Sequence, residues 1–256
     1  MIYKRRVKMH IGLWLAFLLG LYGCGGGNPK VQLSLKDVAQ LKSASHVYIV
    51  DYPSPEFAWW IMPYSLPFTG VVNLNLEKVE KWLELPSPLE LIDPTRTLRN
   101  QIMATLEDNY HFTNLALPQG GSLDENLMDL RKNLREGKVI AIQTYFWKLV
   151  PTGSENGDFL PPKKMPYQFQ YSGNIRFIDL DGPSVIHQHL CHYPPEMAIY
   201  GEGLRPKEYG SFSLERPTWV NSMHVPELIE NRGEKLQTQI HKAVTHCLQE
   251  FQKLFP

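Results

Sequence analysis

Apolar and aromatic residues alternate with polar ones in several short stretches of the chain, a period that predicts half-buried strands. Residues 57–68 are rich in aromatics but contain Pro63 and Pro67, so an edge strand or an apolar loop is expected there. The other strands predicted in this way cover residues 46–51, 71–76, 139–150, 167–177 and 184–191. The last three follow one another, with a turn before the final one, and predict an antiparallel meander.

Three further segments repeat apolar residues every three or four positions, as amphipathic helices do. The first begins at Asp93, which can cap a helix, and Pro94, which suits the first helical position, and continues to about Asn109. The second follows a capping-box pair, Ser122 and Glu125. The longest helix is expected at the C-terminus, where the apolar stripe consists of Ile229, Leu236, Ile240, Val244, Cys247, Phe251 and Leu254.

Together these elements predict an α+β fold in a single domain. We expect a mixed or mainly antiparallel sheet with a C-terminal meander, helices packed on one face and a long C-terminal helix. Residues 31–256 are numerous enough for one core, and no break in composition indicates a second domain.

The N-terminal segment has the pattern of a secretory signal. Basic residues within 4–8 precede an uncharged apolar run from Ile11 to Tyr22, which is 12 residues long. A helix that spans a bilayer needs about 20 apolar residues, whereas the apolar region of a signal peptide needs about 7 to 15. We therefore predict a signal peptide at residues 1–23, followed by a flexible, glycine-rich tether at 24–30.

Residues 21–24 (Leu-Tyr-Gly-Cys) resemble the lipobox of bacterial lipoproteins. This resemblance implies cleavage before Cys24 and attachment of lipid to that cysteine, and two or three acyl chains hold a protein stably on a membrane. Gly25 differs from the aspartate that retains lipoproteins in the inner membrane of enteric bacteria, which implies a periplasm-facing position on the outer membrane. The alternatives are an ordinary cleaved signal with a coincidental cysteine, or an uncleaved anchor.

Charge and composition narrow the classes of partner. The chain contains 26 basic and 26 acidic residues, and 43% of its residues are hydrophobic, as in ordinary folded proteins. Removing residues 1–23 takes away four bases and no acids, which leaves 22 bases against 26 acids, a net charge of −4. Nucleic acid is not expected as a partner, because binding to a phosphate backbone is favoured by an excess of basic charge.

The sequence contains three cysteines, one of which is Cys24 of the lipobox-like segment. If Cys24 carries lipid, Cys191 and Cys247 remain as an even pair in an oxidising compartment, so we predict a disulfide between them, with two buried thiols as the alternative. A strand that leads into one cysteine and a terminal helix that carries another also resemble uncharacterised lipoproteins of proteobacteria over residues 166–254. That resemblance implies the same disulfide and no known activity.

Residues that could carry chemistry are few. The sequence lacks the G-x-S-x-G, H-E-x-x-H, P-loop and G-x-G-x-x-G motifs, so hydrolase and nucleotide-binding functions have no support. His187 and His189 have a spacing that can hold a metal and would share a strand face with Cys191. The simpler interpretation is a pair of histidines on a half-exposed strand, and no metal or cofactor is expected.

Aromatic residues form the other candidate site. Exposed, the aromatic segment would make a surface for a partner or a membrane; buried, it would belong to the core. The residues concerned are Phe57, Trp59, Trp60, Tyr64 and Phe68. A second aromatic group, Tyr145, Phe146 and Trp147, is expected in the core.

The function expected from these patterns is a lipid-anchored periplasmic binding or assembly module of the cell envelope. It would contact the membrane through its lipid and an envelope protein through its folded domain, and no enzymatic activity is expected. One alternative is an envelope hydrolase or metal-dependent enzyme that uses His187 and His189. Another is an auxiliary lipoprotein of a lipid-transport system.

Overall fold

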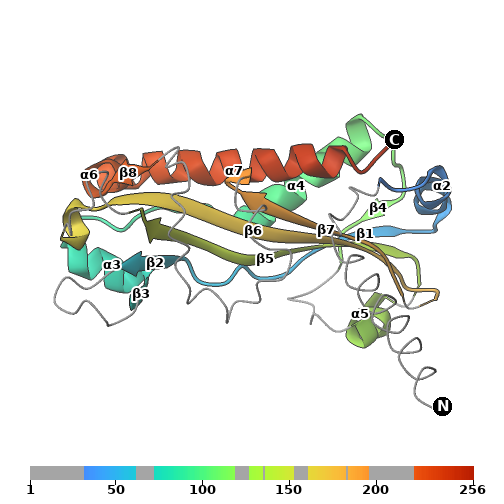
Figure 1. The fold of residues 1–256 in the computed structure, drawn as a ribbon. Helices are drawn as coiled ribbons and strands as arrows, with labels where there is room; N and C mark the ends of the chain where they lie inside the picture. Colours follow the sequence, from blue (N-terminus) through green and yellow to red (C-terminus); the bar gives the residue numbers. More distant parts are fainter. Residues whose placement is uncertain are drawn as a thin grey trace, which may run out of the picture. The chain divides into compact units, whose positions relative to one another are not determined.

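Two long strands, β5 (Lys138–Pro151) and β6 (Pro166–Asp179), pair along their whole length and form the centre of the sheet (Figure 1). They belong to a computed structural model in which residues 33–256 form one compact unit. The structure describes residues 32–61, 72–118, 127–134, 136–152, 161–182, 184–195 and 222–256. The predicted signal peptide and the whole predicted tether, with Cys24, lie outside these residues, as do Ser122 and Glu125 of the predicted capping box.

The sheet is mixed. On the side of β5 away from β6, β1 (Val47–Asp51) and β2 (Ala58–Ile61) pair with β5, and both run parallel to it. On the far side of β6 lie β7 (Ser184–Tyr193) and β8 (Met223–His224), both antiparallel. β4 (Leu115–Ala116) extends the sheet beyond β1. The consecutive antiparallel strands β5, β6 and β7 are the predicted C-terminal meander, and the predicted α+β class with a mixed sheet is confirmed.

The strand within the aromatic segment differs from the prediction. β2 lies between β5 and β3 (Val72–Asn75), which pairs with β2 in the antiparallel sense, so β2 is not an edge strand. The edge prediction relied on Pro63 and Pro67, and both prolines lie outside the described residues, beyond the end of β2. The paired part of the segment contains no proline and can therefore accept neighbours on both sides.

Two long helices cover one face of the sheet. α4 (Pro94–Asp108) contacts β1 and β5, α7 (Glu234–Gln252) contacts β6 and β7, and the two helices also contact each other. Asp93 caps α4 as predicted, because its carboxylate accepts hydrogen bonds from the backbone N–H groups of Thr95 and Arg96. α7 presents the predicted stripe to the sheet, with Leu236, Ile240, Val244, Cys247 and Phe251 all buried.

The C-terminal helix is shorter than the apolar stripe predicted. Ile229 belongs to a separate short helix, α6 (Val225–Ile229), and a 3₁₀ turn (Glu230–Arg232) separates it from α7. Asn231 and Arg232 both have positive φ angles, and Gly233 follows with φ of 91°, so the backbone cannot continue as one helix.

Two helices were not predicted. α2 (Leu35–Ser43) begins with a capping box between Ser34 and Asp37, and α3 (Leu76–Leu83) is capped by the side chain of Asn75. Both contribute few residues to the core, Leu41 from α2 and Val79 from α3. Within the described residues, no helix combines the length and the apolar character needed to cross a bilayer.

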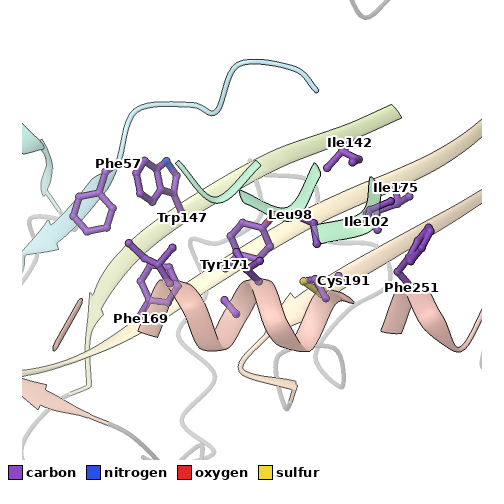
Figure 2. Packing of buried hydrophobic residues seen from close by; sticks show 14 of the residues in the cluster. Phe57, Leu98, Ile102, Ile142, Trp147, Phe169, Tyr171, Ile175, Cys191 and Phe251 are labelled. Carbon is purple, nitrogen blue, oxygen red and sulfur yellow. A yellow bond between two sulfur atoms is a disulfide. The ribbon is translucent and has the colours of Figure 1, made fainter. Parts of the chain in front are cut away.

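The sheet separates two apolar clusters. Along β5, Ile140 and Ile142 point to the main core beneath α4 and α7, whereas Val139 and Ala141 point to a smaller cluster on the opposite face. Figure 2 shows the main core, with Leu98 and Ile102 of α4 and Phe251 of α7 close to Tyr171 and Ile175 of β6. The smaller cluster includes Leu130 of α5 (Leu127–Leu134), so this helix lies on the opposite face, and the prediction that the helices pack on one face is wrong for it.

Candidate functional site

The predicted disulfide joins the meander to the last helix. Cys191 on β7 and Cys247 on α7 are bonded, their Cα atoms are 5.5 Å apart, and both residues are buried (Figure 2). The prediction of this pair is confirmed by the structure, and the alternative of two buried thiols is wrong. The bond holds α7 on the sheet and makes neither sulfur available as a metal ligand.

Part of the predicted partner surface lies in the core. Phe57 packs edge-to-face against Trp147, and Trp59 packs edge-to-face against Tyr167, with all four side chains buried. The surface interpretation is therefore wrong for Phe57 and Trp59, because alternation along β2 turns Trp59 inward toward the main cluster. Trp60 points to the opposite face and is half-buried. Tyr64 and Phe68 lie outside the described residues.

His187 and His189 lie on the same face of β7 as Cys191, as expected, and this face is turned toward the core. They pair with Phe177 and Ile175 of β6, and burial lowers the pKa of His187. Among the described residues, no three His, Cys, Asp or Glu side chains come together in a group that could hold a metal ion. The metal-dependent alternative receives no third ligand from this part of the chain.

The opposite face of the meander carries a group of polar and exposed residues, which we call the polar face. It is formed by alternate positions of three neighbouring strands, those that do not point to the main core. Gln188 is exposed, and the side chains of Tyr145 and Leu190 are each 43% exposed. The residues of the polar face are Tyr145 from β5, Asn174 and Arg176 from β6, and Gln188 and Leu190 from β7.

Tyr145 lies on this face by simple alternation along β5, as Ala141 does. The β5–β6 pairing then shifts by one residue between Thr144 and Phe146, and this bulge reverses the alternation, so that Trp147 points to the main core. The side-chain amide of Asn174 donates a hydrogen bond of 2.8 Å to the Tyr145 hydroxyl. The expectation that Tyr145 belongs to the core is therefore wrong, although Trp147, two residues later, is buried as expected.

Asn174 and Arg176 have unused hydrogen-bonding capacity. The Asn174 carbonyl oxygen Oδ1 and the Arg176 nitrogens Nε and Nη2 are buried and have no hydrogen-bond partner among the described residues. The guanidinium carbon of Arg176 lies 5.7 Å from the centre of the Tyr52 ring. Buried polar groups in native proteins nearly always have partners, so these three atoms are unusual in leaving their hydrogen-bonding capacity unused within the described residues.

A buried lysine lies on the same side of the sheet. The Nζ atom of Lys148 is 3.6 Å from the centre of the Trp60 ring and 4.5 Å from that of Phe146, distances at which a cation is attracted to an aromatic face. Burial lowers the pKa of Lys148 to about 8. The side chain of Lys148 thus joins β5 to Trp60 of the neighbouring strand β2, on the side of the sheet that carries the polar face.

Sequence reasoning did not single out Asn174, Arg176 or Gln188. The signal available was the recurrence of polar residues at alternate positions of β6 and β7, which indicates only that one face is polar. Whether those side chains find partners depends on which residues lie opposite them, and strand register is not visible in the sequence. The arrangement supplies donors, an acceptor and apolar contact area, which suits binding of another molecule.

The chain matches no protein-family model, and no curated protein matches its sequence. Among solved structures, it is similar to a hemagglutinin homolog from Helicobacter pylori that is described as neuraminyllactose-binding. The identity is 12%, the TM-score is 0.35, and the match covers 82% of this chain and 83% of that chain. A likeness at this level carries no conclusion about the function of this chain.

Proposed function

We propose that this protein is a lipid-anchored module of the cell envelope that binds a partner protein through the polar face of its sheet. The observation that carries the binding function is the polar face itself, where exposed Tyr145 and Leu190 lie beside unsatisfied polar atoms of Asn174 and Arg176. Tyr and Arg are enriched among the residues that dominate binding energy at protein interfaces.

The proposed location rests on two features. The lipobox-like residues 21–24 support attachment of lipid at Cys24. The disulfide between Cys191 and Cys247 supports a position outside the cytoplasm, because structural disulfides persist in oxidising compartments. Both features are independent of the polar face.

Fractionation of cells tests the anchor. A Cys24→Ala variant should leave the membrane fraction and appear in the soluble envelope fraction, with the Cys191–Cys247 disulfide still formed. Gly25→Ala is the matched control, since it changes the neighbouring residue and keeps the sulfur. If Cys24→Ala sediments with membranes as fully as the control does, the lipid anchor is wrong.

Site-specific crosslinking tests the polar face. A benzophenone amino acid at Leu190, in the full chain and in intact cells of the native host, should form a protein adduct on illumination. The same probe at Glu107, an exposed position on α4, is the control and should give none. Adducts at Glu107 and not at Leu190 would place the interface elsewhere and contradict the proposal.

A further inference from the structure

β7 is the longest edge strand of the sheet. Among the described strands, β7 pairs with β6 and with no other, so its second side has no neighbouring strand. The other strands with a single neighbour are short: β3 has four residues, and β4 and β8 have two each, whereas β7 has ten. Natural proteins often keep edge strands short so that these strands do not pair with other chains, and β7 lacks this protection.

The sequence of β7 also lacks the residues that usually block pairing at an edge. Between Ser184 and Tyr193 there is no Lys, Arg, Asp, Glu or Pro. Burial lowers the pKa values of His187 and His192, so both imidazoles are neutral at pH 7. The register with β6 shifts near the start of β7, and residues 187–193 then pair with β6 without interruption. This part of β7 is therefore a regular strand in which like charges do not oppose pairing with a second strand.

The alternation of backbone hydrogen bonds shows which groups of β7 point away from β6. The N–H of Leu180, directly after β6, donates to the C=O of Gly137, directly before β5. By alternation, even-numbered residues of β6 direct their backbone groups to β5, and odd-numbered residues direct theirs to β7. Those odd-numbered residues pair with odd-numbered residues of β7. The backbone groups of Gln188, Leu190 and His192 therefore point outward, and no hydrogen bond between described residues uses them.

The side chains of these three residues share the face of β7 that belongs to the polar face. Gln188 and Leu190 are exposed, and His192 is half-buried. Outward backbone groups and accessible side chains thus occur at the same three positions. A strand added to this edge would find a row of donors and acceptors together with surface for side-chain contacts.

A second copy of β7 fits these positions well. Leu190 is the midpoint of residues 187–193, so antiparallel pairing about this residue aligns the whole regular part of both strands. Each Leu190 then lies opposite the other, and each Gln188 lies opposite His192 of the second copy. Leucine meets leucine, and the glutamine amide can donate to or accept from the imidazole. The strand is therefore complementary to itself in both apolar and polar contacts.

We propose that β7 pairs with β7 of a second copy of this chain in the antiparallel sense, with Leu190 at the two-fold axis. The pairing continues the sheet from one copy into the other, and it joins the two polar faces into one surface. The inference goes beyond the proposed function, because a different partner protein can still bind the polar face and either claim can fail without the other.

Crosslinking between two differently tagged full-length copies, expressed together in intact cells of the native host, tests the pairing. A benzophenone amino acid at Gln188 of one copy should give an adduct that carries both tags. The same probe at Glu107, on the helix-covered face, should give none. An unaltered pair of chains that gives no two-copy adduct at Gln188 would overturn the inference.

Charge changes at Leu190 test the position of the axis. Leu190→Lys in both copies places two ammonium groups opposite each other and should lower the yield of the two-copy adduct by at least about fivefold. Leu190→Lys in one copy and Leu190→Glu in the other should restore the yield, which misfolding of either variant would prevent. Leu117→Lys in both copies is the matched control, since Leu117 is also exposed and follows β4 at the other side of the sheet. A yield that Leu190→Lys leaves unchanged, or that the Lys/Glu combination fails to restore, would overturn the inference.

The Leu190 probe of the proposed function separates the two claims. An adduct with a different protein at Leu190, without a two-copy adduct at Gln188, would leave the proposed function and remove the pairing. Two-copy adducts at both positions, with no other protein captured, would remove the proposed partner and support the pairing.

Discussion

The hydroxyl group of Thr144 on β5 lies 3.2 Å from that of Tyr171 on β6, in the layer between the sheet and α4. The Thr144 hydroxyl is also 2.6 Å from that of Thr95, which in turn lies 2.5 Å from the hydroxyl of Ser54. Ser54 donates to the carboxylate of Asp93, the cap of α4. This chain of hydroxyl groups fixes the start of α4 on the sheet next to the β5 bulge between Thr144 and Phe146.

Replacement of Thr144 by valine should lower the free energy of unfolding by about 1 to 3 kcal/mol, because the buried Tyr171 hydroxyl is left without its partner. Thr238→Val is the control, since Thr238 is exposed on α7, and a change within about 0.5 kcal/mol is expected there. Urea denaturation followed by tryptophan fluorescence measures both. Equal midpoints for the two variants would show that the hydroxyl chain does not stabilise the fold.

Gly173 lies against the same tyrosine. A Cβ atom on Gly173 would lie 2.6 Å from the Tyr171 hydroxyl oxygen and 3.1 Å from two ring carbons, and Tyr171 is buried and cannot retreat. Gly173→Ala should therefore destabilise the protein by about 1 to 3 kcal/mol. Gly182→Ala has no atom within 4 Å of its new methyl group and should be nearly neutral. A Gly173→Ala protein with unchanged urea midpoint would contradict this packing.

The disulfide should contribute strongly to stability. Cys191 and Cys247 are 56 residues apart in sequence, and closing a loop of this size stabilises a fold by about 4 kcal/mol on the chain-entropy model. The double variant Cys191→Ala/Cys247→Ala should lose about this much free energy of unfolding. Dithiothreitol should bring the unaltered protein down to the level of the variant and leave the variant unchanged. A difference between the two that persists under reduction would indicate a packing effect of the sulfurs.

Lys148 should make stability depend on pH in the alkaline range. Burial lowers its pKa to about 8 in the folded protein, against an ordinary value of 10.5, so between these pH values the unfolded chain binds the additional proton. Stability therefore rises with pH in this window, since raising the pH removes the charge that burial disfavours. A Lys148→Met variant has no such group and lacks this increase.

The stability difference between Lys148→Met and the unaltered protein should shrink by about 2 kcal/mol from pH 7.5 to pH 10. Tyr167 and Tyr171, whose pKa values burial raises to about 12, affect both proteins alike and cancel in this comparison. Urea midpoints measured at several pH values supply the difference. A constant difference across the window would mean that the ammonium group is not desolvated in the folded state.

The sequence predicts most of the central architecture because the elements there have strong local signals. The strands β5, β6 and β7 are long, and the helix α4 is long and well capped. Their apolar periodicity therefore identifies the type of element even where its first or last residue is misplaced. α2 was missed because only Leu41 among its residues is fully buried, so its stripe is weak and the cap at Ser34 was the only clear signal. The break before α7 was visible as Gly233, yet the stripe from Ile229 onward matched a continuous helix equally well.

The candidate site was less predictable than the fold. Cys191 and Cys247 could be paired by counting, but the aromatic segment could not be divided into core and surface without knowing that β2 lies between two strands. Strand pairing places Ala141 and Gln188 on either side of Arg176. Because neither side chain is acidic, Arg176 has no ion-pair partner across the strands, and only this pairing made it part of the candidate site. Such pairings are set by contacts between distant parts of the chain, which local patterns do not record.

The intact mass of the mature protein, extracted from native membranes without reductant, tests the central claim most directly. The account predicts a chain that begins at Cys24, carries the mass of its acyl chains, and is two hydrogens lighter than the fully reduced chain because Cys191 and Cys247 are joined. A mass that still includes residues 1–23, or that shows Cys24 without lipid, would contradict the account.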